Sequence, residues 1–293
     1  MRLTATSAAI MAALCPASAY AQDDGDFEQK DWRITIGGGV ASFGENRDQP
    51  YGSVSLRRNF DNFYVSLGGA VAGYDGRDPA AGDTVPASTQ QLTLGAGYES
   101  NALALDTYVS IGDRDFEEIA ITGPGGTPLT FNADGGSWSL GAALTYQFAL
   151  GGRWYAAPFA AIDYSEISTA QILAAPGGQF VTRDIDEDGV TASTGATIQY
   201  ALGEKSQHSI GVYGAFVATS NTASTTRIVG TDTATGAPQR LDGASDGDSW
   251  FEYGASASFA LSDAIVLDLW LSRTAGLSFG EATSAAVSLS FDF

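Results

Sequence analysis

The chain has 293 residues and a formal net charge of −20 at pH 7, with 44% hydrophobic and 11% aromatic residues. This composition excludes a disordered chain, and the acidity excludes a basic phosphate-binding surface, so no nucleic-acid partner is expected. One histidine and one cysteine leave few candidates for nucleophilic catalysis or a zinc site. The 36 glycines, about 12% against a usual ~7%, need a structural explanation.

The first residues indicate a secretory signal peptide. One arginine precedes an apolar stretch, which ends on a small-x-small cleavage site at residues 19–21. Cys15 raises the alternative of a lipoprotein signal, but Leu14 occupies the position where such a signal needs a small residue. We therefore predict a signal peptide over residues 1–21 and a single cysteine-free domain over residues 22–293.

The predicted mature chain is a series of segments in which apolar residues alternate with polar or small ones. The alternation is plainest over residues 92–99, 103–111, 138–148 and 265–272, and it predicts β-strands. About twelve such segments follow one another, each roughly 10–14 residues long. Strands in soluble proteins are usually about 5–6 residues long. A soluble β-sandwich, the main alternative, would explain the alternation but not this length.

The connections between the segments alternate in length. Short connections near residues 61, 100, 151, 204 and 263 alternate with longer ones, of which the long polar examples are residues 75–88, 113–134, 169–188 and 221–248. This alternation predicts an up-and-down meander with an even number of strands, so that both termini lie at the short-turn end. Short turns at one end and long loops at the other are typical of transmembrane β-barrels.

The last segment, Ala285 to Phe293, alternates strictly and ends on an aromatic residue. Together with the leader and the alternating strands, this ending resembles Gram-negative outer-membrane β-barrel proteins. The resemblance implies that the protein lies in the outer membrane and contacts lipid and lipopolysaccharide. It also implies that the barrel-assembly machinery reads the terminal strand through Val287, Leu289, Phe291 and Phe293.

We therefore predict an all-β fold, a closed up-and-down antiparallel transmembrane β-barrel of about 12 strands. In lipid every backbone polar group must be paired within the protein, and only closure of the sheet achieves this for strands. The terminal strand is accordingly expected to pair with the first one, Trp32 to Phe43.

The residues opposite the apolar face are mostly Gly, Ser or Thr, which we interpret as the wall of a water-filled lumen. The alternative is that these glycines relieve strain in a curved sheet or accept aromatic neighbours. Charged groups in a pore set its selectivity by their sign. The predicted pore-lining residues are Arg57, Asp106, Arg153, Asp163, Glu252 and Asp268.

Two further candidate sites are weaker. Asp184, Asp186 and Asp188 begin a D-x-D-x-D-G pattern like the first half of a calcium loop, although the twelfth position is Gly195 rather than Glu. A solvated acidic loop is the alternative, and weakly bound calcium is the only cofactor expected. His208 follows a short turn, at the end opposite to the one where outer-membrane hydrolases work, so no enzymatic activity is expected.

The function favoured by the sequence is a passive channel for small hydrophilic solutes with a weak cation preference. The alternative is a non-catalytic surface, structural or adhesive barrel that acts through its long outer loops. An outer-membrane enzyme ranks lower because it lacks a site. An autotransporter-like translocator also ranks lower, because only residues 22–31 lie between the leader and the first strand, too few for a passenger.

Overall fold

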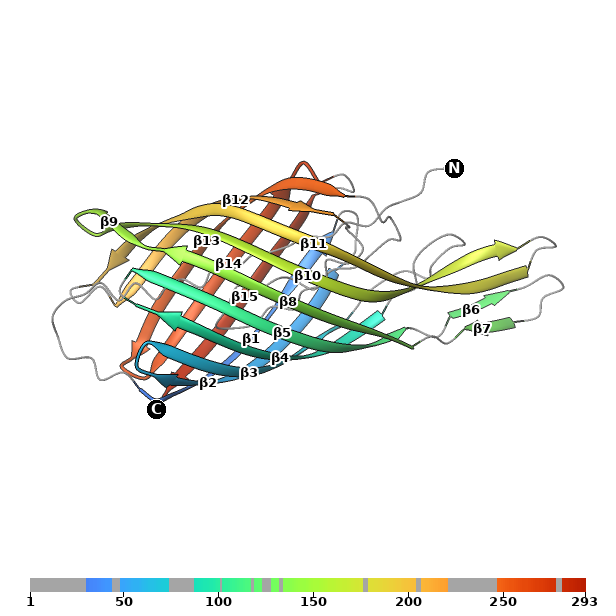
Figure 1. The fold of residues 1–293 in the computed structure, drawn as a ribbon, viewed down its shortest axis with the longest axis horizontal. Coiled ribbons are helices and arrows are strands. Elements are labelled where there is room, and N and C mark those ends of the chain that lie inside the picture. Colours follow the sequence, from blue (N-terminus) through green and yellow to red (C-terminus); the bar gives the residue numbers. More distant parts are fainter. Residues whose placement is uncertain are drawn as a thin grey trace.

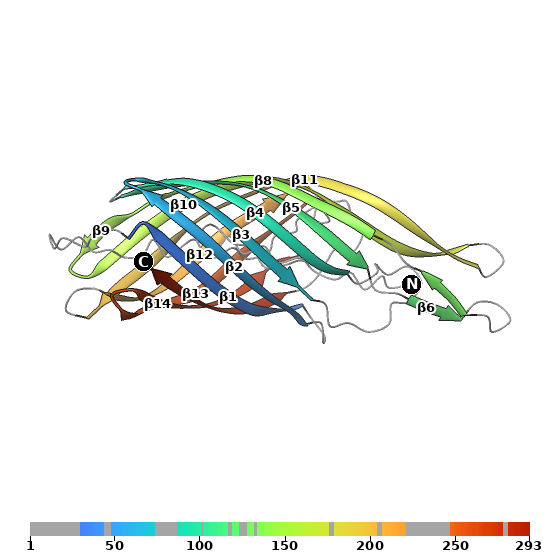
Figure 2. The same cartoon turned by 90° about the horizontal axis from the view of Figure 1, so that it is seen from below.

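The computed structural model of the chain is a barrel whose strands run obliquely to its long axis (Figures 1 and 2). The predicted signal peptide lies outside the described part of the chain, in which no helix is long and apolar enough to cross a membrane. The structure describes residues 30–43, 48–73, 87–100, 102–116, 119–122, 128–131, 134–175, 179–203, 207–220, 247–277 and 281–293.

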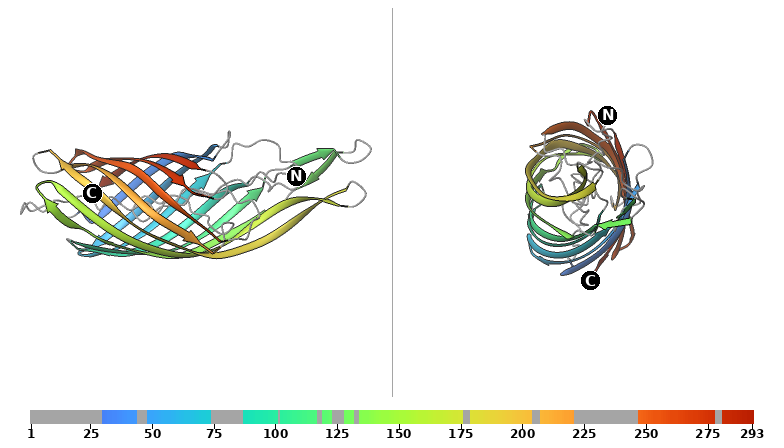
Figure 3. Two further views of the ribbon diagram at one scale, coloured as in Figure 1. Left: turned by 90° about the horizontal axis from the view of Figure 1, so that it is seen from above. Right: turned by 90° about the vertical axis from the view of Figure 1, so that its right-hand side faces the viewer.

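Twelve of the described strands form one closed ring, seen end-on in Figure 3. Each pairs antiparallel with its neighbours along the chain, which confirms the predicted fold class. The strands are β1 Trp32–Phe43, β2 Asp48–Phe60, β3 Phe63–Ala72, β4 Ala87–Glu99, β5 Leu103–Phe116, β8 Asp134–Tyr146, β10 Trp154–Ala175, β11 Gln179–Leu202, β12 His208–Thr219, β13 Asp248–Ser262, β14 Ile265–Ala275 and β15 Ala282–Asp292. A short strand, β9 (Phe148–Gly151), pairs with the start of β10, and β6 (Ile119–Thr122) pairs with β7 (Pro128–Phe131) in a separate hairpin.

The two faces of the wall differ as the alternation predicts. Apolar side chains point outward, for example Ile36, Leu67 and Leu140, which are 54%, 51% and 55% exposed. Their neighbours Thr35 and Ser139 point inward and are buried. An outward apolar band is what a hydrocarbon environment requires of a barrel.

The first and last strands are joined along their whole length. Their register runs from Arg33 opposite Asp292 to Phe43 opposite Ala282. The Trp32 N–H donates to the Phe293 carbonyl at 3.0 Å, and the reciprocal bond is 2.9 Å. This pairing confirms the prediction that the terminal strand closes the barrel.

Side chains reinforce this seam on its inner face. The Arg33 Nε donates to Asp292 Oδ1 at 2.6 Å and a terminal guanidinium nitrogen donates to Oδ2 at 3.0 Å. Two residues further along each strand, the hydroxyls of Thr35 and Ser290 lie 3.0 Å apart. A bidentate charged pair of this kind fixes geometry as well as adding energy, so it favours one register of closure.

The end of the barrel that holds Trp32 and Phe293 carries the short turns. A two-residue turn joins β2 to β3, and Asp61 in it has a φ of 53°, a left-handed conformation that Asp tolerates. Gly152 and Gly203 also have positive φ at this end. Both termini of the barrel therefore lie at the short-turn end, as predicted.

At the opposite end, two of the predicted loops contain β-strands, so these two loop predictions are wrong. Residues 169–188 form the tip of a hairpin in which β10 and β11 continue past the rim of the barrel (Figure 1, right). Residues 113–134 include the end of β5 and the β6–β7 hairpin. At the base of this extension the Ser168 hydroxyl donates across the strands to Asp186 at 2.8 Å. Most of the other two predicted long connections, residues 75–88 and 221–248, lies outside the described residues.

The terminal strand yields a prediction about assembly. We expect Phe293→Asp to lower the amount of barrel in the outer membrane, while barrels that do assemble keep a normal melting temperature. The Phe293 side chain is exposed at the rim, so the finished wall does not depend on it. The measurement is the amount of heat-modifiable barrel on gels of outer-membrane fractions. Phe60→Asp is the matched control, since Phe60 is an exposed rim aromatic on β2. Equal loss for both variants would contradict a role specific to the terminal strand.

The seam yields a second prediction. We expect Arg33→Asp or Asp292→Arg alone to lower the free energy of unfolding by about 1.5–3 kcal/mol, the usual contribution of a hydrogen bond to a charged group. The double exchange should restore most of the loss, as measured by urea unfolding in lipid vesicles. Arg273→Asp is the control: its partner Glu281 is on the outer face and both side chains are 53% exposed, so the cost should stay below about 1 kcal/mol. A double exchange no better than the single variants would rule the pairing out as the cause.

Candidate functional site: the inner wall of the barrel

The structure places most of the predicted pore-lining residues on the inner wall. Arg153 is the exception, because it lies in the exposed turn between β9 and β10. Asp268 is half-buried and lies opposite the buried Ser258 in the register of β13 and β14. The other four are buried on the inner face of β2, β5, β10 and β13: Arg57, Asp106, Asp163 and Glu252.

Arg57 is held by its neighbours on the wall. Its guanidinium donates to both carboxylate oxygens of Glu99, at 2.9 and 2.6 Å, and to Asn59 at 2.6 Å. The same group lies 3.7 Å from the ring centre of Tyr64, whose hydroxyl donates to Asp106. These contacts brace β2 to β5 at the short-turn end. Glu99 is not among the predicted pore-lining residues, although its place in the alternation of β4 puts it on the inward face.

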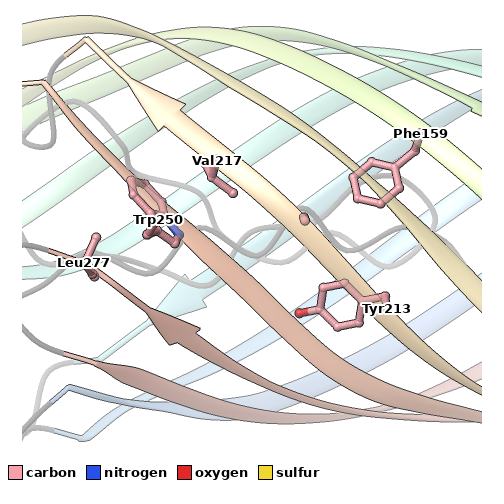
Figure 4. Close-up of a cluster of buried hydrophobic side chains, with 6 residues drawn as sticks. Phe159, Tyr213, Val217, Trp250 and Leu277 are labelled. Carbon is pink, nitrogen blue, oxygen red and sulfur yellow. The ribbon is translucent and has the colours of Figure 1, made fainter.

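A second cluster occupies the other side of the barrel, since β12 is six strands from β3 in the ring. Tyr213 donates its hydroxyl to Glu252 Oε1 at 2.6 Å and stacks on Trp270 with ring centres 4.5 Å apart. Tyr213 belongs to a cluster of buried apolar side chains that also includes Phe159 and Trp250 (Figure 4). None of these large inward-facing residues was among the predicted pore-lining residues, apart from Glu252.

The inner glycines have a specific role at five positions. Each lies directly opposite an inward aromatic residue of the neighbouring strand, and a Cβ added there would overlap the aromatic ring. At these sites the alternative interpretation, that inner glycines accept aromatic neighbours, describes the wall better than open space for water. The pairs are Gly39 with Tyr51, Gly97 with Tyr64, Gly141 with Tyr108, Gly195 with Phe159, and Gly254 with Tyr213.

Between the two clusters the wall carries many short hydroxyl side chains, several of which bond across strands. Thr191 donates to Thr219 at 3.0 Å, and the hydroxyls of Ser272 and Ser284 lie 3.1 Å apart. The wall between the clusters is therefore polar.

The other sequence candidates do not form sites of the expected kind. Asp184, Asp186 and Asp188 lie on strand β11 rather than in a loop. Because a strand rises about 3.3 Å per residue, the first and third of these positions are about 13 Å apart instead of being wrapped around one ion. Among the described residues no group of three or more His, Cys, Asp or Glu is arranged to hold a metal. Weak calcium binding by these carboxylates stays a prediction, without the loop that motivated it.

His208 begins β12 at the short-turn end. Its Nδ1 accepts a hydrogen bond from the Ala260 backbone N–H at 3.1 Å, and its ring centre is 6.0 Å from that of Phe259. These contacts are structural, joining β12 to β13 near the turn.

The barrel is similar to one known protein family and to several solved structures. The family described as "Autotransporter beta-domain" matches residues 65–269, from β3 to β14. The β-domain of the Bordetella autotransporter BrkA is similar at TM-score 0.58 and 16% identity, over 91% of this chain and 100% of that one. The translocator domain of the autotransporter NalP from Neisseria meningitidis is similar at TM-score 0.59 and 12% identity, over 92% and 90%. No curated protein matches the chain.

At these identities the structural likeness shows the fold, and the match across most of the strands shows the family. The predicted Gram-negative outer-membrane β-barrel and its location in the outer membrane are confirmed. The chain belongs to the autotransporter β-domain family.

Proposed function

We propose that this barrel is a translocator, whose hydrophilic lumen conducts a polypeptide segment across the outer membrane and whose wall anchors it there. Family membership supports this function over the passive channel that the sequence alone favours. The adhesive alternative depends on outer loops that fall largely outside the described residues.

The observation that carries the proposal is the place where β1 begins. Trp32 is paired with Phe293 at the short-turn end of the barrel, which in this class of barrel faces the periplasm. A segment that precedes β1 therefore starts on the periplasmic side. Because hydrocarbon does not admit an unpaired backbone, such a segment can reach the cell surface only through the lumen.

The chemistry of the inner wall supports passage rather than retention. Several of its polar groups bond to each other across strands, as Arg57 does with Glu99 and Thr191 with Thr219. Groups that are already paired offer few strong contacts to a passing chain, since each new hydrogen bond would replace an existing one.

The proposal predicts the location of a segment placed before β1. An unstructured epitope inserted before Lys30 should become accessible to antibody and protease on intact cells. The same epitope in the turn between Ser262 and Ile265 should be accessible only after the outer membrane is permeabilised. Protection of the first epitope in cells whose barrel is fully assembled would contradict translocation.

A passive channel with weak cation preference remains a second candidate. Among the inward-facing charged groups with described side chains, acids outnumber bases. The bases are Arg33, Arg57 and Arg114, and the acids include Asp292, Glu99, Asp106, Asp163, Glu252 and Asp268. Fields are focused in a low-dielectric lumen, so this excess favours cations.

This second candidate predicts the sign of a reversal potential. In planar bilayers under a KCl gradient we expect discrete conductance steps with a modest cation preference, which shrinks as salt rises because screening limits fields to about 8 Å near 0.15 M. Asp268→Asn should reduce the preference, whereas Asp263→Asn in the exposed turn should not. An anion-selective sign would contradict the charge argument, and an absence of conductance would exclude the open channel.

A further inference from the structure

Arg58 faces the lipid side of the barrel, at the short-turn end. It lies two residues before the end of β2, and the residues on either side of it in the alternation of that strand, Leu56 and Phe60, are exposed apolar residues of the outer face. Arg58 is exposed as well, whereas Arg57 beside it is buried on the inner wall. Its side chain therefore leaves the wall near the level where the apolar band ends and the membrane interface begins.

Two aromatic rings hold the guanidinium group of Arg58. Its Cζ lies 5.1 Å from the ring centre of Trp32, the residue directly opposite on β1, and 4.8 Å from the ring centre of Phe60. Both distances are within the range of cation–π contacts, which extends to about 6 Å. A ring face attracts the charge but accepts few hydrogen bonds, so the N–H donors of the guanidinium remain available for an acceptor.

Within the described part of the chain, no acidic side chain pairs with Arg58. The residues that surround it on the outer face are apolar: Trp32 and Val65 lie opposite it on the two neighbouring strands, and Leu56 and Phe60 lie along its own strand. Other arginines of the barrel do have carboxylate partners, namely Arg33 with Asp292, Arg57 with Glu99 and Arg273 with Glu281. A lipid-facing cation is costly unless it reaches water or an anion, so an anion at the membrane surface would complete this site.

The outer face between Arg58 and the membrane centre suits acyl chains. Successive outward residues of β2 become smaller, from Leu56 through Val54 to Gly52, and Gly52 lies opposite Gly38 of β1. A Cβ added at Gly52 would have only one atom within 4 Å, a backbone oxygen at 3.9 Å, so the outer face is open there. Six residues of a strand tilted by about 40° cover about 15 Å of depth, half of the ~30 Å hydrocarbon core. An apolar path thus runs from Arg58 to near the bilayer centre.

We propose that Arg58, Trp32 and Phe60 form a headgroup site for a phospholipid of the periplasmic leaflet, whose acyl chains lie along β1 and β2. The planar guanidinium fork matches two oxygens of a phosphate, and a Trp ring is stable at headgroup level because it is amphipathic. The apolar path favours a lipid over free phosphate, which would gain nothing from contact with Leu56 or Val54. The bound lipid would cover the outer face of β1, the strand that closes the barrel against β15. This inference does not depend on the translocation function.

A lipid titration of the full-length purified barrel in detergent tests the site. Phosphatidylglycerol is added, and bound lipid is counted by native mass spectrometry. We expect Arg58→Gln to weaken binding of the most tightly held lipid about fivefold, as for the loss of one basic residue at an anionic lipid surface. Arg153→Gln is the matched control, because it removes the same charge from an exposed turn at the same rim and should leave this binding unchanged. Equal weakening in both variants, or none in Arg58→Gln, overturns the inference.

Further comparisons separate the parts of the site. Trp32→Leu keeps the charge and removes one ring, so it should weaken binding of phosphatidylglycerol about two- to fivefold, the usual contribution of an exposed cation–π contact. Diacylglycerol with the same acyl chains lacks the phosphate and should bind equally to the native barrel and to Arg58→Gln. Heat-modifiability establishes that each variant is assembled. Displacement of the lipid by excess inorganic phosphate would identify a free-anion site, and undiminished binding in Trp32→Leu would exclude the ring; either result contradicts the site as proposed.

Discussion

The architecture depends on pairing the last strand with the first. In hydrocarbon an unpaired N–H or C=O costs several kcal/mol, so a membrane sheet is stable only without edges. β15 and β1 remove both edges at once, and the pair between Arg33 and Asp292 fixes their register on the inner face. Because the number of strands is even, the first and last residues of the barrel both lie at the short-turn rim. The route of any preceding segment through the lumen follows from that placement.

Closure imposes curvature, and the inner face shows how the sequence accommodates it. On a concave wall, side chains of neighbouring strands converge, so two large residues cannot lie opposite each other without strain. At Gly97 and Gly254 the neighbouring strand supplies a tyrosine whose ring lies over the glycine. Tyr64 and Tyr213 then each donate a hydroxyl hydrogen to an inward carboxylate. The abundant glycines thus do not simply hollow out the lumen, because several of them make room for aromatic rings.

The strands could be predicted where lipid selects an apolar face, as at Leu92 and Leu94, because burial in hydrocarbon imposes the period of two. The extension of β10 and β11 could not be predicted in this way. Beyond the membrane no lipid selects for apolar residues on one face, while the backbone pairing of the two strands continues. Side-chain partners were also hidden. Arg57 and Glu99 are 42 residues apart and meet across β3, a contact that depends on the register of three strands. The sequence alone indicated whether a residue faces inward or outward, but it did not indicate which side chain lies beside that residue on another strand.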